Sequence, residues 1–168
     1  MLIILETLIM LLYALYNNFS GCSNLAQGYN ALYSNTGGCN NLAVGCFALY
    51  YNTFGYNNFA QGYKALYCNT SGNGNIAQGY KALYCNKNGS HNIAIGCCSL
   101  TNTLCSGNIG IGTTSPTNQL HVQGSSGVSA VMLRGTDAAS WTGYTLSNDV
   151  GTIGWLMTGG STHTNSSR

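Results

Sequence analysis

The chain has 168 residues and a net charge of +2, and only 5% of its residues are charged, against about 25% in an ordinary soluble domain. Charge this sparse supplies no basic stripe for nucleic acid and no polybasic patch for an anionic membrane. Polarity comes from uncharged Asn, Ser, Thr, Gln and Gly, a composition more typical of a fibre or an adhesin than of an enzyme.

The first segment, residues 1–12, differs from everything that follows. It reads MLIILETLIMLL, with Glu6 as its single charge and no basic start. It therefore does not resemble a secretory signal, and it is too short to span a bilayer. Two interpretations stay open: an apolar cap over the first coil, or a frame-shifted or truncated copy of the repeat that follows.

From Tyr13 the chain repeats one pattern with a strict period. The pair Ala31-Leu32 returns 17 residues later at 48–49, and again at 65–66 and 82–83. The consensus is G-x-x-N-ϕ-A-x-G-x-x-A-L-Y-x-N-x-x, where ϕ is apolar, and almost five copies run without insertion or deletion. A unit this short cannot bury a core alone, so each copy is expected to stack on the next.

Strands suit this unit better than helices. Two glycines and two asparagines per copy oppose a helix, and residues 92–96 (NIAIG) alternate large and small apolar side chains as a half-buried strand does. We expect Gly-x-x-Asn to form a corner, because both residues tolerate positive φ. The sequence thus predicts an all-β fold, a parallel β-solenoid or β-roll of 17-residue coils over residues 13–112. A helical turn in the Ala-Leu-Tyr stretch of each coil stays open as an alternative.

Stacking turns each column of the repeat into a ladder with rungs about 4.8 Å apart. Identical asparagines above one another can bond amide to amide. The inward columns of Ala, Gly and Leu make a thin core, and the Tyr column adds an apolar stripe, so we expect several chains wound side by side. The predicted structural ladders are Asn24, Asn41, Asn58, Asn75 and Asn92, with Leu32, Leu49, Leu66, Leu83 and Leu100.

The period breaks after Leu100. Residues 107–112 read as a shortened last coil, and Pro116 is expected to end it. Residues 113–127 are predicted to form a linker with one short strand at 119–123. Three further strands, at 128–133, 141–146 and 152–157, predict a partial β-sandwich or meander over 128–168, a small and incomplete antiparallel β domain.

The sequence lacks the residue patterns of an active site. Its three carboxylates, on Glu6, Asp137 and Asp149, lie in no common motif, and His91, His121 and His163 each stand alone. His91 is expected in a surface turn, and His121, between Leu and Val, is expected to face solvent. No phosphate-binding loop, dinucleotide fingerprint or nucleophile elbow occurs. We therefore predict that the protein is not an enzyme and has no catalytic residue, cofactor or metal site.

The eight cysteines mostly occupy repeat columns, where they replace Tyr, Asn or Ser. The favoured interpretation is that they are small apolar fillers. Disulfides between neighbouring coils are an alternative, because stacked columns bring Cα atoms within reach while their parallel Cβ vectors oppose bridging. Metal binding is less favoured, because no C-x-x-C pair occurs.

The repeat, together with NIGIGTTSPTNQLHVQG at residues 108–124, resembles the repeat stalks of phage and large-virus tail-fibre proteins. The NIAIG motif is also similar to the head repeats of bacterial trimeric autotransporter adhesins. The resemblance covers residues 13–124 and implies an elongated, β-structured homotrimer on a virion surface or outside the cell. It implies attachment to a host-surface glycan or protein, while the sparse charge leads us to expect no nucleic-acid partner and no membrane insertion. A fragment of a longer fibre is compatible with it.

The functional prediction is accordingly a structural and adhesive segment of a viral or phage fibre. A self-assembling extracellular filament and a trimeric adhesin head are the alternatives. An ice-binding surface is less favoured, because Lys87 interrupts the short column Thr36, Thr53 and Thr70. Sugar binding would need outward Tyr or Gln columns, but those columns can equally serve only the stack, so no residue is assigned to ligand binding. The candidate outward columns are Tyr29, Tyr63 and Tyr80, and Gln27, Gln61 and Gln78.

Overall fold

The computed structural model describes residues 13–103, 105–124, 143–148 and 151–157. The chain divides into two compact units, Met1–Gly124 and Ser125–Arg168. The predictions made for residues 1–12 and for the strand at 128–133 lie outside the described residues.

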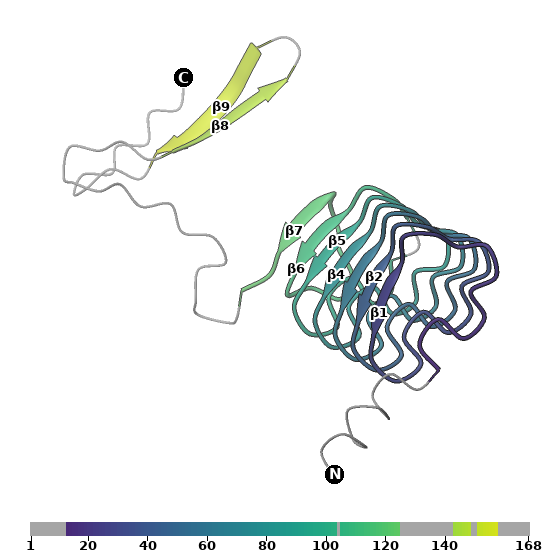
Figure 1. Ribbon diagram of the computed structural model, residues 1–168. Helices are drawn as coiled ribbons and strands as arrows, with labels where there is room; N and C mark the ends of the chain where they lie inside the picture. Colours follow the sequence, from purple (N-terminus) through teal and green to yellow (C-terminus); the bar gives the residue numbers. More distant parts are fainter. Residues whose placement is uncertain (1–12, 104, 125–142, 149–150, 158–168) are drawn as a thin grey trace, which may run out of the picture. The chain divides into compact units, whose positions relative to one another are not determined.

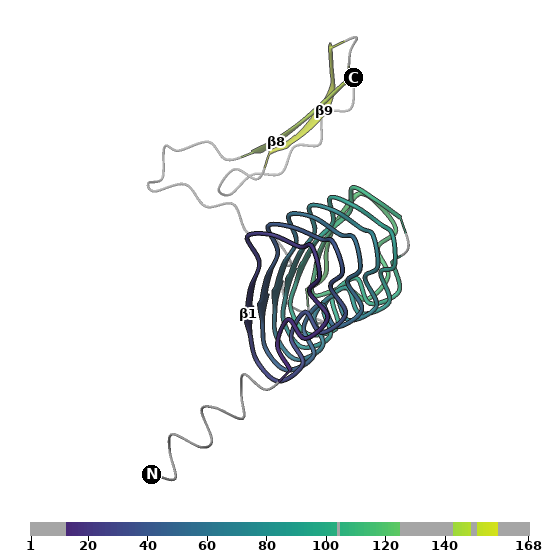
Figure 2. The same cartoon turned by 45° about the vertical axis from the view of Figure 1, so that its right-hand side comes forward.

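The first unit is a stack of coils that each contribute one short strand to a parallel sheet (Figures 1 and 2). Seven strands lie in sequence order across this sheet, and no helix occurs in the described part of the chain. The expected all-β parallel solenoid is therefore confirmed. The strands are β1 (Leu25–Gln27), β2 (Leu42–Val44), β3 (Phe59–Gln61), β4 (Ile76–Gln78), β5 (Ile93–Ile95), β6 (Ile109–Ile111) and β7 (Leu120–Val122).

The register of the sheet follows the repeat. Leu25 pairs with Leu42, Leu42 with Phe59, and so on to Ile93, so that every step equals one copy of the unit. Later steps are shorter: Ile93 pairs with Ile109, and Ile109 pairs with Leu120. The last two steps of the sheet therefore use fewer residues than the four before them.

The core comes from three columns of small and medium side chains. The central residue of each strand points inward, as Ala43 does, while its two neighbours point outward. The second and third columns, the Ala-Leu pairs from Ala31-Leu32 to Ala82-Leu83, are fully buried. Each buried Leu contributes about 1.5–3 kcal/mol by leaving water, so the leucine column is the main apolar stabilisation of each coil.

The Ala-Leu-Tyr stretch forms a turn, and the alternative of a helical turn is wrong. Leu66 has φ of 50° and Lys64 has φ of 54°, both in the left-handed region, and equivalent residues in the other coils do the same. This conformation costs about 1–2 kcal/mol for a residue with a Cβ atom. It reverses the chain within a few residues and directs Ala65 and Leu66 into the core, where both are fully buried.

Two asparagine ladders run through the stack. The first ladder contains Asn24, Asn41, Asn58, Asn75, Asn92 and Asn108, and the second contains Asn18, Asn35, Asn52, Asn69 and Asn86. Asn58 is typical of the first ladder: its backbone N and its Nδ2 both donate to Asn41 Oδ1, at 3.0 and 3.1 Å. Buried amide groups need such partners, because an unpaired one costs about 1–3 kcal/mol.

The glycine of Gly-x-x-Asn joins the two ladders. The carbonyl of Gly72 accepts from Asn58 Nδ2 at 2.9 Å and from Asn69 Nδ2 at 3.0 Å. Positive φ falls instead on the residue before the first-ladder asparagine, such as Asn57 or His91. The glycine is needed for space, because a Cβ atom at Gly72 would lie 2.3 Å from the carbonyl oxygen of Gly89.

Strand β7 continues the parallel sheet directly after β6, past Pro116. Its central residue, His121, pairs with Gly110. It therefore occupies the column in which strands β1 to β5 carry inward-pointing alanines. His121 is half-buried, and its Nδ1 accepts a hydrogen bond from the backbone N of Thr117 at 3.3 Å. The expectation that His121 faces solvent was wrong, because Leu120 and not His121 is the outward residue, with 61% exposure.

The described residues of the second unit form one antiparallel pair, β8 (Gly143–Asn148) and β9 (Gly151–Met157). The pairing runs from Gly143 opposite Met157 to Asn148 opposite Gly151, with an irregularity between Leu146 and Ser147.

Candidate functional surface

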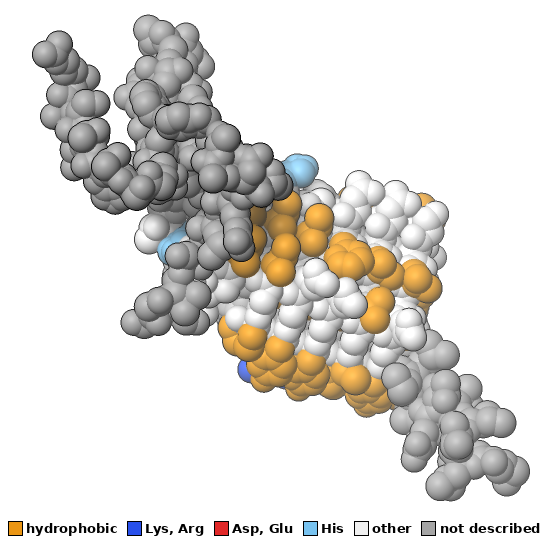
Figure 3. Space-filling view, turned by 90° about the vertical axis from the view of Figure 1, so that its left-hand side faces the viewer, with side chains coloured by type: hydrophobic (Ala, Val, Ile, Leu, Met, Phe, Trp, Pro, Cys, Tyr) orange, Lys and Arg blue, Asp and Glu red, His pale blue; other side chains and the backbone are white. Residues whose placement is uncertain are grey.

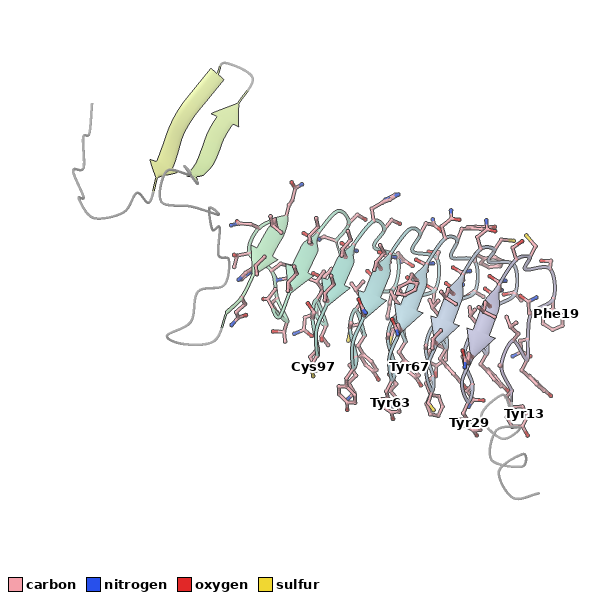
Figure 4. All side chains as sticks on the ribbon, turned by 60° about the vertical axis from the view of Figure 1, so that its left-hand side comes forward. Tyr13, Phe19, Tyr29, Tyr63, Tyr67 and Cys97 are labelled. Carbon is pink, nitrogen blue, oxygen red and sulfur yellow. The ribbon has the colours of Figure 1, made fainter. Side chains whose placement is uncertain are left out.

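One edge of the stack is lined with aromatic rings, and we call this edge the aromatic corner. It follows the turn of each coil, where side chains flanking the buried Ala-Leu pair point outward. Figure 4 shows Tyr13, Tyr29 and Tyr63 projecting from this edge, with Cys97 in line with them. The corner consists of a stacked column, Tyr16, Tyr33, Tyr50, Tyr67 and Tyr84, and an outer set, Tyr13, Tyr29, Phe47, Tyr63 and Tyr80.

The stacked column is geometrically regular. Tyr33 and Tyr50 have ring centroids 5.1 Å apart with planes 7° apart, and Tyr67 and Tyr84 have 5.2 Å and 2°. Each such pair is worth about 0.5–1.5 kcal/mol beyond the burial of area. The rings therefore reinforce the coil spacing set by the backbone.

Burial raises the pKa of two phenols in this column. The pKa of Tyr67 is raised to about 12, mainly by desolvation and then by the hydrogen bond with Tyr51. Desolvation likewise raises the pKa of Tyr50. Both rings are neutral at physiological pH and present hydroxyl groups rather than phenolates.

Two lysines lie among the rings. Lys64 Nζ is 5.2 Å from the ring centroid of Tyr67, 5.3 Å from that of Tyr63 and 5.7 Å from that of Phe47. Lys81 Nζ is 5.2 Å from the Tyr80 centroid and 5.7 Å from the Tyr84 centroid. A hydrogen bond with Tyr80 is the main cause that raises the pKa of Lys81. These cation–π contacts fix the positions of the ammonium groups at the edge.

A second feature, which we call the apolar row, crosses the outer face of the sheet. It consists of the first residue of every strand: Leu25, Leu42, Phe59, Ile76, Ile93, Ile109 and Leu120. Leu25 is 60% exposed, Ile76 40% and Leu120 61%. Figure 3 shows this row as a band of hydrophobic side chains across the strands, separate from the band along the aromatic edge.

Of the two outward columns that the sequence predicts, the Tyr column belongs to the aromatic corner, and the Gln column occupies the last position of β1, β3 and β4. Tyr63 and Tyr80 are exposed, as are Gln27, Gln61 and Gln78. The two glutamines at 61 and 78 lie one coil apart, with Gln78 Nε2 donating to Gln61 Oε1 at 3.5 Å. The period of the repeat identifies both columns; strand alternation directs the Gln side chains outward, whereas the direction of the Tyr side chains follows from the turn geometry.

The cysteines lie at the surface instead of filling the core. All eight are free, and each is exposed or half-buried. Hydrogen bonding to the Cys39 thiol raises the pKa of Cys22, the contact with Cys98 raises that of Cys97, and burial raises that of Cys68. These three groups are thiols at neutral pH, unlike nucleophilic cysteines, whose pKa is lowered by nearby positive charge.

Within the described residues, no three His, Cys, Asp or Glu side chains come together as a metal site would require. The same residues contain no helix long and apolar enough to cross a membrane. His91 lies in the corner before β5, and His121 lies in β7, two strands further along the sheet.

No protein-family model, curated protein or solved structure matches this chain.

Proposed function

We propose that the chain is a structural and adhesive segment of a viral or phage fibre, in which several copies lie side by side through the apolar row. One observation carries this proposal: the row runs along the sheet face from β1 to β7 with three exposed and four half-buried apolar side chains and no charged member. Exposed apolar patches of this extent mark interaction surfaces in soluble proteins.

A second copy of the chain is the partner that fits best. The row repeats once per coil, so its partner must carry apolar groups at the same spacing over several coils. Another copy of the chain has the same sequence and therefore carries the same row. In an assembly with closed rotational symmetry, the equivalent rows would face a common axis. We propose three chains, in line with the resemblance to trimeric fibres, with the second unit forming a small antiparallel β domain.

The thin core supports the same conclusion. Within the described residues its buried apolar side chains are alanines and leucines, and small cores of this kind gain little stability alone. Association through the apolar row would add burial of Leu, Ile and Phe at about 25 cal/mol per Å².

The test is the absolute mass of the full chain in solution by light scattering and sedimentation equilibrium. We expect a discrete species of three chains that resists dilution. The double variant Phe59→Lys/Ile76→Lys should dissociate, because it places two charges in the row. The matched control Gln61→Lys/Gln78→Lys adds the same charges to the same strands outside the row and should keep the wild-type mass.

A monomeric wild-type chain would contradict the proposal, as would equal effects of the two double variants. Open-ended polymers would favour the alternative of a self-assembling extracellular filament that grows coil on coil.

A further inference from the structure

Two adjacent coils carry the same surface. Residues 61–69 and 78–86 both read QGYKALYCN, and the 17-residue register stacks one copy on the other. Each copy presents an exposed Gln, an exposed Tyr and a Lys held against aromatic rings. Tyr63 and Tyr80 stack with centroids 5.5 Å apart and planes 13° apart. The surface is therefore a pair of equivalent subsites one coil apart.

Positive charge at this surface has no counter-charge in the described chain. Within the described ranges the basic side chains are Lys64, Lys81 and Lys87, and these ranges contain no Asp or Glu. Lys81 is held as an ammonium by its contact with Tyr80. In a low-charge surface an uncompensated pair of cations attracts an anionic ligand.

The rest of the surface favours a ligand with many hydroxyl groups. The Gln amides offer both donors and acceptors, and the Tyr hydroxyls do the same. The subsites repeat linearly along the stack, at the coil spacing of about 4.8 Å, which is close to the length of one sugar ring in an extended glycan. A linear polymer of acidic sugars matches the charge, the hydroxyl chemistry and the repeat together.

We propose that the subsites Gln61–Lys64 and Gln78–Lys81 bind an acidic polysaccharide, with carboxylates on the two lysines and consecutive sugars on consecutive coils. The inference rests on the proposed function as a host-attachment fibre, since it names the ligand class of that fibre. Nucleic acid fits less well, because two lysines neutralise only about two phosphates and nucleic-acid affinity depends on many such contacts.

The test measures binding of the full chain to end-labelled polymers by fluorescence anisotropy. The probes are polygalacturonate, dextran sulfate, neutral dextran and oligo(dT). We expect binding to polygalacturonate and none to dextran. Lys64→Ala or Lys81→Ala should each weaken binding about fivefold, as removal of one exposed ion pair does. Lys81→Arg should retain affinity, because it keeps the charge.

The matched control is Lys87→Ala, which removes the same charge from an exposed position outside the corner. It should leave affinity for polygalacturonate unchanged. An equal loss in this control, tighter binding of oligo(dT) or dextran sulfate than of polygalacturonate, or no binding of polygalacturonate would each overturn the inference.

Light scattering on the same samples gives the molar mass of the assembly, so that the fibre proposal and the ligand proposal can be tested separately. A chain that assembles but ignores acidic polysaccharide would refute the ligand class and leave the fibre in place. A monomer that binds polygalacturonate through Lys64 and Lys81 would refute the fibre and leave the site in place.

Discussion

Asn69 donates from Nδ2 to Oδ1 of Asn52 at 2.8 Å, and both side chains are completely buried. The same Nδ2 also donates to the carbonyl of Gly72 at 3.0 Å. Each inner amide of the second ladder thus bonds to the coils on both sides of it and to the glycine carbonyl of its own corner. The polar interior of this solenoid stabilises the stack only as long as the ladder is unbroken.

Interrupting the second ladder should therefore cost more than losing one hydrogen bond. In Asn52→Ala, Asn35 Oδ1 loses its donor, Asn69 Nδ2 loses one acceptor, and a small cavity opens. We expect a loss of about 2–4 kcal/mol in the free energy of unfolding, measured by urea denaturation. Asn102→Ala, at an exposed asparagine, is the control. Equal small losses in both variants would contradict the role given to the ladder.

The second ladder ends with an unsatisfied atom, and this end can be repaired. Asn86 Oδ1 is buried without a hydrogen-bond partner, because the next residue in its column is the buried Thr103. Thr103→Asn places an Nδ2 donor at the ladder position that asparagines occupy in the preceding coils. We expect it to stabilise the chain by about 1 kcal/mol, seen as a higher urea midpoint at unchanged slope. The exposed change Thr114→Asn should have no such effect, and a destabilised Thr103→Asn variant would show that the last coil differs in shape.

The period of the sequence was sufficient to predict the strands, but not the turns between them. Alternating residues such as Ile93, Ala94 and Ile95 predict a strand, and a constant spacing predicts the parallel register. Left-handed φ at Leu66 could not be predicted, because propensity assigns that conformation to Gly or Asn. It is tolerated because it brings the Leu side chain into the core at each coil.

Two further features depended on neighbouring coils and were invisible in a single repeat. The sequence predicts positive φ at the corner glycine, whereas in the structure this glycine is needed because Asn side chains and the backbone of the next coil leave no space for a Cβ atom. The clustering of Lys64 with Tyr63, Tyr67 and Phe47 joins residues from two coils. Composition could not indicate it, because the direction of these side chains is set by the turn.

The corner glycine gives a sharp test of this packing. A Cβ atom at Gly55 would lie 2.2 Å from Asn52 Oδ1 and 2.6 Å from the carbonyl oxygen of Gly72. Gly55→Ala should therefore destabilise the chain by at least about 3 kcal/mol, because a backbone atom must move. The control is Gly37→Ala, whose nearest neighbour is the ring of Phe54 at 3.3 Å. Thermal unfolding followed by circular dichroism would compare them, and a well-folded Gly55→Ala variant would refute the close approach.

The raised pKa of Tyr67 makes the stability of the stack sensitive to alkali. The pKa rises from an ordinary 10.0 to about 12 in the folded chain, so an unfolded chain loses this proton first as pH increases. Stability from this group is full below pH 10 and is lost as pH rises toward 12. Tyr67→Phe should flatten the decline in melting temperature over that interval, because the phenol that resists ionisation is gone. Tyr56→Phe removes an exposed ring hydroxyl from another column and should leave the decline as it is in the wild type. Identical alkaline profiles for the wild type and Tyr67→Phe would mean that the ring ionises as readily in the stack as in water.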